Sequence, residues 1–145
     1  MRKRHHMLRI PRKSHAALPL TLMSVLYWFS SLAGSPVQDD PAVYGLFHWL
    51  SPLVHNALHV PAYAALSLSW HWALRAWLTR GWAIIAGAWL ITSSYGLFDE
   101  WHQSSVPGRY ASVGDIALDL AGATLGIWLA VRLERRTRAP TERFS

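Results

Sequence analysis

The length and composition of this chain favour one domain embedded in a membrane. Of its 145 residues, 52% are apolar and only 15% are charged, and nine are tryptophan. This balance is unusual for a soluble domain. The formal charge of +6 sits in the flanks of apolar stretches, so it does not form the continuous basic surface that nucleic-acid binding requires. The absence of cysteine excludes disulfides, thiolate metal sites and cysteine nucleophiles.

The first element is a basic segment, residues 1–15, that leads into an apolar stretch, residues 16–34. This arrangement is typical of a first membrane helix and also of a cleavable secretory signal. Ala33 and Gly34 are small enough for a signal peptidase, but further apolar stretches follow them. We therefore expect a retained membrane helix, with a cleaved signal as the alternative. Lipoprotein processing is excluded because no cysteine follows Gly34.

Three more apolar stretches follow, at residues 52–72, 82–98 and 116–131, each close to the ~17–25 residues that cross a bilayer as a helix. A soluble helical bundle is the alternative, because polar residues interrupt the first and last of these stretches: His55, Asn56, His59 and Asp119. The sequence predicts an all-α, polytopic membrane bundle of about four transmembrane helices in residues 16–132. The basic segment 1–15 and the basic tail 133–145 flank this domain in the cytoplasm.

The distribution of basic residues predicts which side of the membrane each end occupies. With both ends in the cytoplasm, thirteen of the fourteen Lys and Arg residues lie inside and only Arg109 lies outside. This asymmetry follows the positive-inside rule. Most of the tryptophans lie near predicted helix ends, where their rings anchor helices at the interface. We expect a multi-pass protein of the cell inner membrane with both termini inside.

The second apolar stretch carries a polar stripe. His55, His59 and Tyr63 follow one another at steps of four, so a helix places them on one face, from its outer end toward the membrane centre. Two histidines on one stripe suit metal binding or proton relay, although interfacial histidines also snorkel to water. Pro61 cannot donate to the carbonyl of Ala57, which leaves an acceptor that a polar group must satisfy. We expect His59 and Tyr63 to belong to a functional site.

The densest chemistry lies in residues 98–115, FDEWHQSSVPGRYASVGD. Ahead of Asp115, this segment combines two acids, a histidine, a glutamine and the only outer arginine: Asp99, Glu100, His102, Gln103 and Arg109. Pro107 and Gly108 predict a tight turn that folds Arg109 back toward the other polar residues. The plain alternative is an ordinary polar loop that contains an ion pair.

The last stretch opens with Asp115, which we expect to cap the helix, and carries Asp119 one turn deeper on the same face. A carboxylate without a partner at that depth is unfavourable or takes up a proton, so we expect Arg109 or His59 beside Asp119. Two small residues four positions apart then predict close packing against another helix: Gly122 and Gly126.

These motifs resemble the VanZ-like family of small membrane proteins over roughly residues 53–129. The strongest part is DEWHQSSVPGR, residues 99–109, continued by Asp115, Asp119 and the two glycines, and the second part is LHVPAYAAL, residues 58–66. Family members usually carry a lysine, often after an aspartate, one turn before the histidine. Here those positions hold His55 and Asn56, so any role of that lysine in holding a phosphate or carboxylate does not transfer.

The family name comes from a protein linked to resistance to the glycopeptide antibiotic teicoplanin, and the resemblance implies a role in the cell envelope. It does not imply that this chain confers resistance. The first function that fits is a non-enzymatic protein whose outer pocket binds a lipid-linked or anionic headgroup. Arg109 would be the bidentate anion contact, with hydrogen bonds from other members of the cluster: His59, His102 and Gln103. The excess of acid opposes a bare phosphate unless carboxylates are protonated or a cation intervenes.

A second function is that of a membrane enzyme acting on a phospholipid or a polyprenyl-linked envelope precursor. Glu100 or His102 would then be the general base, and Arg109 would stabilise developing charge. Asp119 would orient His59, the third catalytic candidate. A third function, an ion- or proton-coupled transporter, would need a homo-oligomer or partners and lacks comparable polar groups at the inner end. The expected partners are membrane lipid and a lipid-linked precursor, with no nucleic acid. The sequence assigns no metal, and it leaves the cofactor, the ligand and the oligomeric state open.

Overall fold

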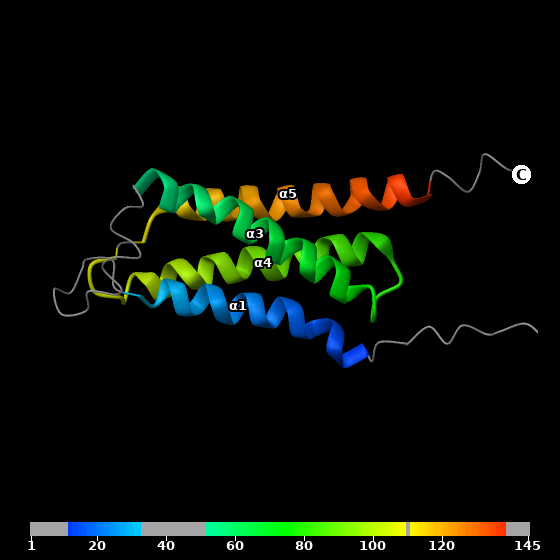
Figure 1. Ribbon diagram of the computed structural model, residues 1–145, viewed down its shortest axis with the longest axis horizontal. Helices are drawn as coiled ribbons and strands as arrows, with labels where there is room; N and C mark the ends of the chain where they lie inside the picture. Colours follow the sequence, from blue (N-terminus) through cyan, green and yellow to red (C-terminus); the bar gives the residue numbers. More distant parts are fainter. Residues whose placement is uncertain (1–11, 33–51, 110, 139–145) are drawn as a thin grey trace, which may run out of the picture.

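The computed structural model describes residues 12–32, 52–109 and 111–138, with side chains from residue 14 in the first range and from residue 57 in the second. Within these ranges every regular element is helical. A short 3-10 helix, η1 (Arg12–Ala16), continues into α1 (Ala17–Ser30), and α3 (Pro52–Leu74), α4 (Gly81–Gln103) and α5 (Val113–Arg138) follow. The four α-helices lie lengthwise beside one another (Figure 1). The predicted all-α bundle with four helical stretches is therefore confirmed.

Two of the four helices, α4 and α5, are long and apolar enough to cross a membrane, and only about a third of the residues in these apolar windows are buried. Helix α1 has 14 residues, so it approaches the ~17–25 residues that cross a bilayer only together with the five residues of η1 that lead into it. Helix α3 is long enough, but three of its buried side chains are polar: Ser67, Ser69 and His71. These side chains lower the mean hydropathy of α3, although they face the interior of the bundle and not the medium around it.

Helices α3 and α4 each contact the other three α-helices, and the contact between α3 and α5 is the most extensive. Tyr63 and Leu66 of α3 are buried together with Tyr95 of α4. The Tyr95 hydroxyl donates to the carbonyl oxygen of Met23 at 2.6 Å, which fastens α4 to α1. At the end of the bundle where α3 stops, Arg75 Nη1 lies 3.0 Å from Glu134 Oε1, with His71 Nε2 at 3.9 Å from the same oxygen. No such polar group was expected at this end from the sequence.

The closest helix contact joins α5 to α3 at the two glycines predicted to pack. A Cβ atom at Gly122 would lie 2.5 Å from the carbonyl oxygen of Val60 and 2.9 Å from the Cβ atom of Tyr63. A Cβ atom at Gly126 would collide with the carbonyl oxygen of Ala64 in the same way. Because both obstacles include backbone atoms of α3, side-chain rotation cannot make room. The register of α5 against α3 therefore requires glycine at both positions.

We expect Gly122→Ala to destabilise the bundle, although alanine favours an isolated helix by about 1 kcal/mol over glycine. Overpacking typically costs about 1–3 kcal/mol, and here the obstacle is rigid backbone. The measurement is reversible unfolding in mixed micelles. Gly81→Ala is the matched control, since a Cβ atom there meets nothing within 4 Å. Equal stability of the two variants would show that α5 does not pack on α3 at Gly122.

Candidate functional site

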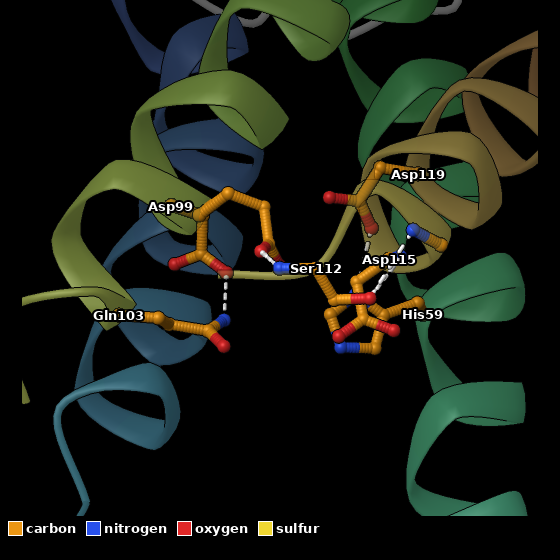
Figure 2. A network of polar contacts seen from close by, with 8 residues as sticks. His59, Asp99, Gln103, Ser112, Asp115 and Asp119 are labelled. Atoms are coloured by element: carbon orange, nitrogen blue, oxygen red, sulfur yellow. Dashed lines mark hydrogen bonds and ion pairs between the residues drawn. The ribbon is translucent and has the colours of Figure 1, made fainter. Parts of the chain in front are cut away.

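A cluster of polar side chains lies where α3 begins, α4 ends and α5 begins (Figure 2). We call it the polar cluster, and its members are His59, Tyr63, Asp99, Glu100, Gln103, Asp115 and Asp119. In Figure 2, Asp99 and Gln103 on α4 face His59 and Asp115 on the other two helices. Asp99, Glu100, Gln103 and Asp119 are each no more than 5% exposed. Acidic side chains are rarely buried in this way, so this end of the bundle is the candidate functional site.

The central contact of the polar cluster joins two helices that are far apart in the sequence. His59 Nδ1 of α3 lies 2.7 Å from Asp119 Oδ1 of α5, with side-chain exposures of 11% and 2%. An ionised carboxylate only accepts hydrogen bonds, so when Asp119 is ionised the Nδ1–H group of His59 is the donor. The sequence-based expectation of Arg109 or His59 beside Asp119 is met by His59. This contact fixes the orientation of the imidazole ring.

Helix α4 supplies two acids through its last turn, which extends to Gln103 rather than ending at residue 98 as predicted. Gln103 Nε2 donates to Asp99 Oδ2 at 2.8 Å, one turn apart on the same face. Glu100 Oε2 accepts a hydrogen bond from the backbone N–H of Ser112 at 2.8 Å. Glu100 therefore ties the end of α4 to the start of α5.

Ser112, and not Asp115, caps α5. The Ser112 hydroxyl oxygen accepts hydrogen bonds from the backbone N–H groups of Gly114 at 3.1 Å and Asp115 at 3.4 Å. The expectation that Asp115 caps the helix was wrong by one turn, because the helix begins at Val113. Asp115 lies in the first turn, where a negative charge is favourable. The motif of serine followed three residues later by an acid is a known helix-start signal that could have been recognised.

Tyr63 and Asp119 meet at Gly96 of α4. A Cβ atom at Gly96 would lie 2.9 Å from Asp119 Oδ2 and 3.2 Å from Tyr63 Cε1. The absence of a side chain at Gly96 thus makes room for both groups between α4 and the other helices. The ring of Tyr63 also lies nearly parallel to that of His59, with centroids 6.1 Å apart. Nothing in the local sequence pattern singled out Gly96.

Several buried polar atoms of the polar cluster have no hydrogen-bond partner among the described residues. They are Asp99 Oδ1, Glu100 Oε1, Asp115 Oδ1, Asp119 Oδ2 and the Tyr63 hydroxyl. Each such atom in a protein interior typically costs about 1–3 kcal/mol. The charges of Asp99 and Asp115 also act on the His59–Asp119 pair. The polar cluster is therefore rich in acceptors and short of donors.

Two predicted site residues, His102 and Arg109, lie on the α1 side of α4. His102 Nε2 is 3.0 Å from the Ser31 hydroxyl, and its ring stacks on Tyr27 with centroids 4.5 Å apart. Arg109 Nη1 donates to the carbonyl oxygens of Ser30 at 2.9 Å and Phe29 at 3.4 Å. These carbonyls end α1, so Arg109 satisfies acceptors that a helix terminus leaves over.

The predicted turn at Pro107 and Gly108 is confirmed. The backbone N–H of Arg109 donates to the Val106 carbonyl at 3.1 Å, and Gly108 has a φ of 75°, a value that favours glycine. Burial lowers the pKa of the Arg109 guanidinium, while three acids oppose that shift: Asp99, Glu100 and Asp115. The turn therefore carries Arg109 into the field of the acids and onto the end of α1.

Among the described residues, no group of three or more His, Asp or Glu side chains is arranged to hold a metal ion. The side chain of His55, which the sequence placed on the same stripe as His59, lies outside the described side chains. The polar cluster can donate and accept protons at His59 and Asp119, and it can accept hydrogen bonds from a ligand.

The fold and the polar cluster together define a small all-helical protein with two membrane-capable helices and an acid-rich site at one end. The family model VanZ/LLP1 matches residues 8–134, which is most of the chain. The chain belongs to the VanZ/LLP1 family. No curated protein and no solved structure matches it.

Proposed function

We propose that this VanZ-like protein is a four-span protein of the cell inner membrane that binds the headgroup of an envelope lipid in the polar cluster. The observation that carries the proposal is the buried contact between His59 and Asp119 at 2.7 Å. Buried ionisable groups inside a membrane bundle are costly and generally mark a functional site.

The position of the polar cluster supports a lipid as the ligand. Asp115 is half-buried at the end of the bundle, whereas Asp99 and Glu100 lie deeper. Phe98 and Trp101 adjoin these acids on α4 and are exposed by 43% and 68%. A lipid can therefore lie against these exposed rings at the end of the bundle that holds the acids, where Phe98 contacts Tyr27 and His102 on the α1 side of α4. Aromatic rings of this kind are frequent at membrane interfaces.

The test is native mass spectrometry of the full chain, extracted in mild detergent from its own membranes. We expect a lipid adduct on the wild type and a several-fold weaker adduct on the isosteric variant Asp119→Asn, which removes the negative charge that holds His59. Glu134→Gln is the matched control, because it changes an acid at the opposite end. Equal adducts on all three proteins would contradict headgroup binding at the polar cluster.

The contact between His59 and Asp119 also favours a second function, that of a membrane enzyme acting on a phospholipid or lipid-linked precursor. A carboxylate bound to Nδ1 directs proton exchange to Nε2, as in many histidine-dependent hydrolytic sites. Glu100 is a further proton-transfer candidate, while His102 lies on the α1 side. Conversion of the copurified lipid by the wild type, and its abolition in His59→Gln, would establish the enzyme. An unchanged lipid would leave binding as the function.

The proposed topology places both ends of the chain in the cytoplasm. Since the chain has no cysteine, single cysteines can report the sidedness of each loop. We expect Ser105→Cys, after α4, to react with an impermeant thiol reagent on intact spheroplasts. Thr79→Cys, between α3 and α4, should react only after permeabilisation. Both residues are exposed. The reverse labelling pattern would refute the topology.

A further inference from the structure

We infer that the polar cluster recognises a primary ammonium group, and thus a lipid headgroup that carries an amine. This inference rests on the proposed headgroup site and names the chemistry of its ligand. It differs from the anionic headgroup that the sequence suggested, in which Arg109 would be the main contact.

The first support is the charge of the polar cluster. It contains four carboxylates, Asp99, Glu100, Asp115 and Asp119, against the single imidazole of His59. One oxygen of each carboxylate is buried without a hydrogen-bond partner among the described residues. In their ionised form these carboxyl groups repel an anionic group and attract a cation, and a bound cation itself favours the ionised form.

The second support is the Tyr63 hydroxyl, which is not an acid. Tyr63 is 1% exposed, and its hydroxyl lies close to the Asp119 carboxyl but makes no hydrogen bond of standard length in the described part of the chain. Its ring lies beside Asp119 Oδ2 in the space left by Gly96. A phenolic hydroxyl both donates and accepts, so it can accept from a ligand while the acids do the same. The unpartnered atoms therefore point to a ligand that brings several donors.

An ammonium group fits these acceptors better than a metal ion. The described carboxylates and His59 are not gathered as the ligands of one metal ion. A primary ammonium has three N–H donors and makes charge-assisted hydrogen bonds of about 2.7–2.9 Å, longer than the ~2.0–2.6 Å of metal–oxygen bonds. It can therefore serve acceptors that lie farther apart.

Arg109 does not fill this role itself. Its Nη1 atom donates to the carbonyl oxygens of Ser30 and Phe29 at the end of α1. The guanidinium lies within the field of Asp99, Glu100 and Asp115, although no ion pair within 4.0 Å joins it to these acids in the described residues. The charge of Arg109 therefore lies near the acids without supplying their missing hydrogen bonds.

The experiment is a titration of the full-length protein in detergent with five lipids of identical acyl chains. Four have headgroups that differ only in N-methylation: phosphatidylethanolamine, its monomethyl and dimethyl forms, and phosphatidylcholine. The fifth is phosphatidylglycerol, which is anionic and has no amine. We expect the affinity to fall stepwise as N–H donors are removed, by at least about tenfold from phosphatidylethanolamine to phosphatidylcholine, with weak binding of phosphatidylglycerol.

The isosteric variants Asp99→Asn and Glu100→Gln should reduce this difference, while Glu134→Gln should preserve it. Circular dichroism verifies that each variant is folded. Equal binding of phosphatidylethanolamine and phosphatidylcholine, or tighter binding of phosphatidylglycerol, would overturn the amine while leaving a headgroup site in place. Absence of binding by every lipid would overturn both proposals. Soluble ethanolamine is a separate arm, and its binding with no gain from acyl chains would support the amine and assign it to a free molecule.

Discussion

Replacing Asp119 with alanine should destabilise the protein by about 3–5 kcal/mol, the typical cost of removing one partner from a buried ion pair. The reason is the contact between Asp119 Oδ1 and His59 Nδ1, which joins α3 to α5 within the polar cluster. The measurement is reversible unfolding in mixed micelles, performed for both single alanine variants and the double variant. The effects should be strongly non-additive, because either substitution alone removes the shared contact.

Asp115→Ala is the control for this experiment, since Asp115 is half-buried in the first turn of α5 and is not paired with His59. A negative charge in that position stabilises the helix by about 0.3–1 kcal/mol through the helix dipole. Additive effects of the Asp119 and His59 substitutions, or an Asp115 variant as unstable as that of Asp119, would show that the pair does not hold the bundle together.

Gly96→Ala should misplace Asp119 with far less damage to the rest of the fold. The new Cβ atom would lie 2.9 Å from Asp119 Oδ2, 3.1 Å from Asp119 Cβ and 3.2 Å from Tyr63 Cε1. We expect a loss of about 1–3 kcal/mol in stability and roughly a tenfold loss of headgroup affinity, since 1.4 kcal/mol corresponds to a factor of ten. The direct readout is ¹⁵N NMR of the His59 ring, whose Nδ1–H tautomer depends on Asp119.

The matched control for Gly96→Ala is Gly87→Ala, on the same helix α4. There the nearest atom to a new Cβ is Leu74 Cδ1 at 3.1 Å, the far end of a flexible side chain that can move aside. The control should keep both the NMR spectrum of His59 and the affinity for lipid. A Gly96 variant with an unchanged His59 spectrum would mean that Gly96 does not position the pair.

The helices could be predicted from the sequence because apolar stretches of membrane length are a strong signal. The end of α4 was placed five residues early, since Asp99, Glu100 and Gln103 read as loop residues although they form its inward face. Local polarity cannot reveal that a polar residue will be covered by another helix. The three-dimensional packing of α5 on α3 and α4 supplies that cover.

The contacts within the candidate site could be predicted from the sequence only in part. His59 was one of the two partners expected for Asp119, and the turn before Arg109 was recognisable from Pro107 and Gly108. The direction in which that turn sends Arg109 was not, because the end of α1 competes for the guanidinium with its exposed carbonyls. Such competition between distant segments depends on the fold and leaves no mark in the local pattern.

The buried polar side chains of α3 bear on how the protein is made. His59 and Asp119 are 60 residues apart, so at roughly 5–20 residues per second a ribosome completes the partner about 3–12 s after His59. If the chain enters the bilayer as proposed, the histidines and serines of α3 that are covered in the finished bundle have no covering helix α5 during that interval. Its retention then depends on α5, the apolar helix synthesised last. We expect α3 to stay beside the insertion machinery until α5 has been synthesised. The two helices are then released into the bilayer together.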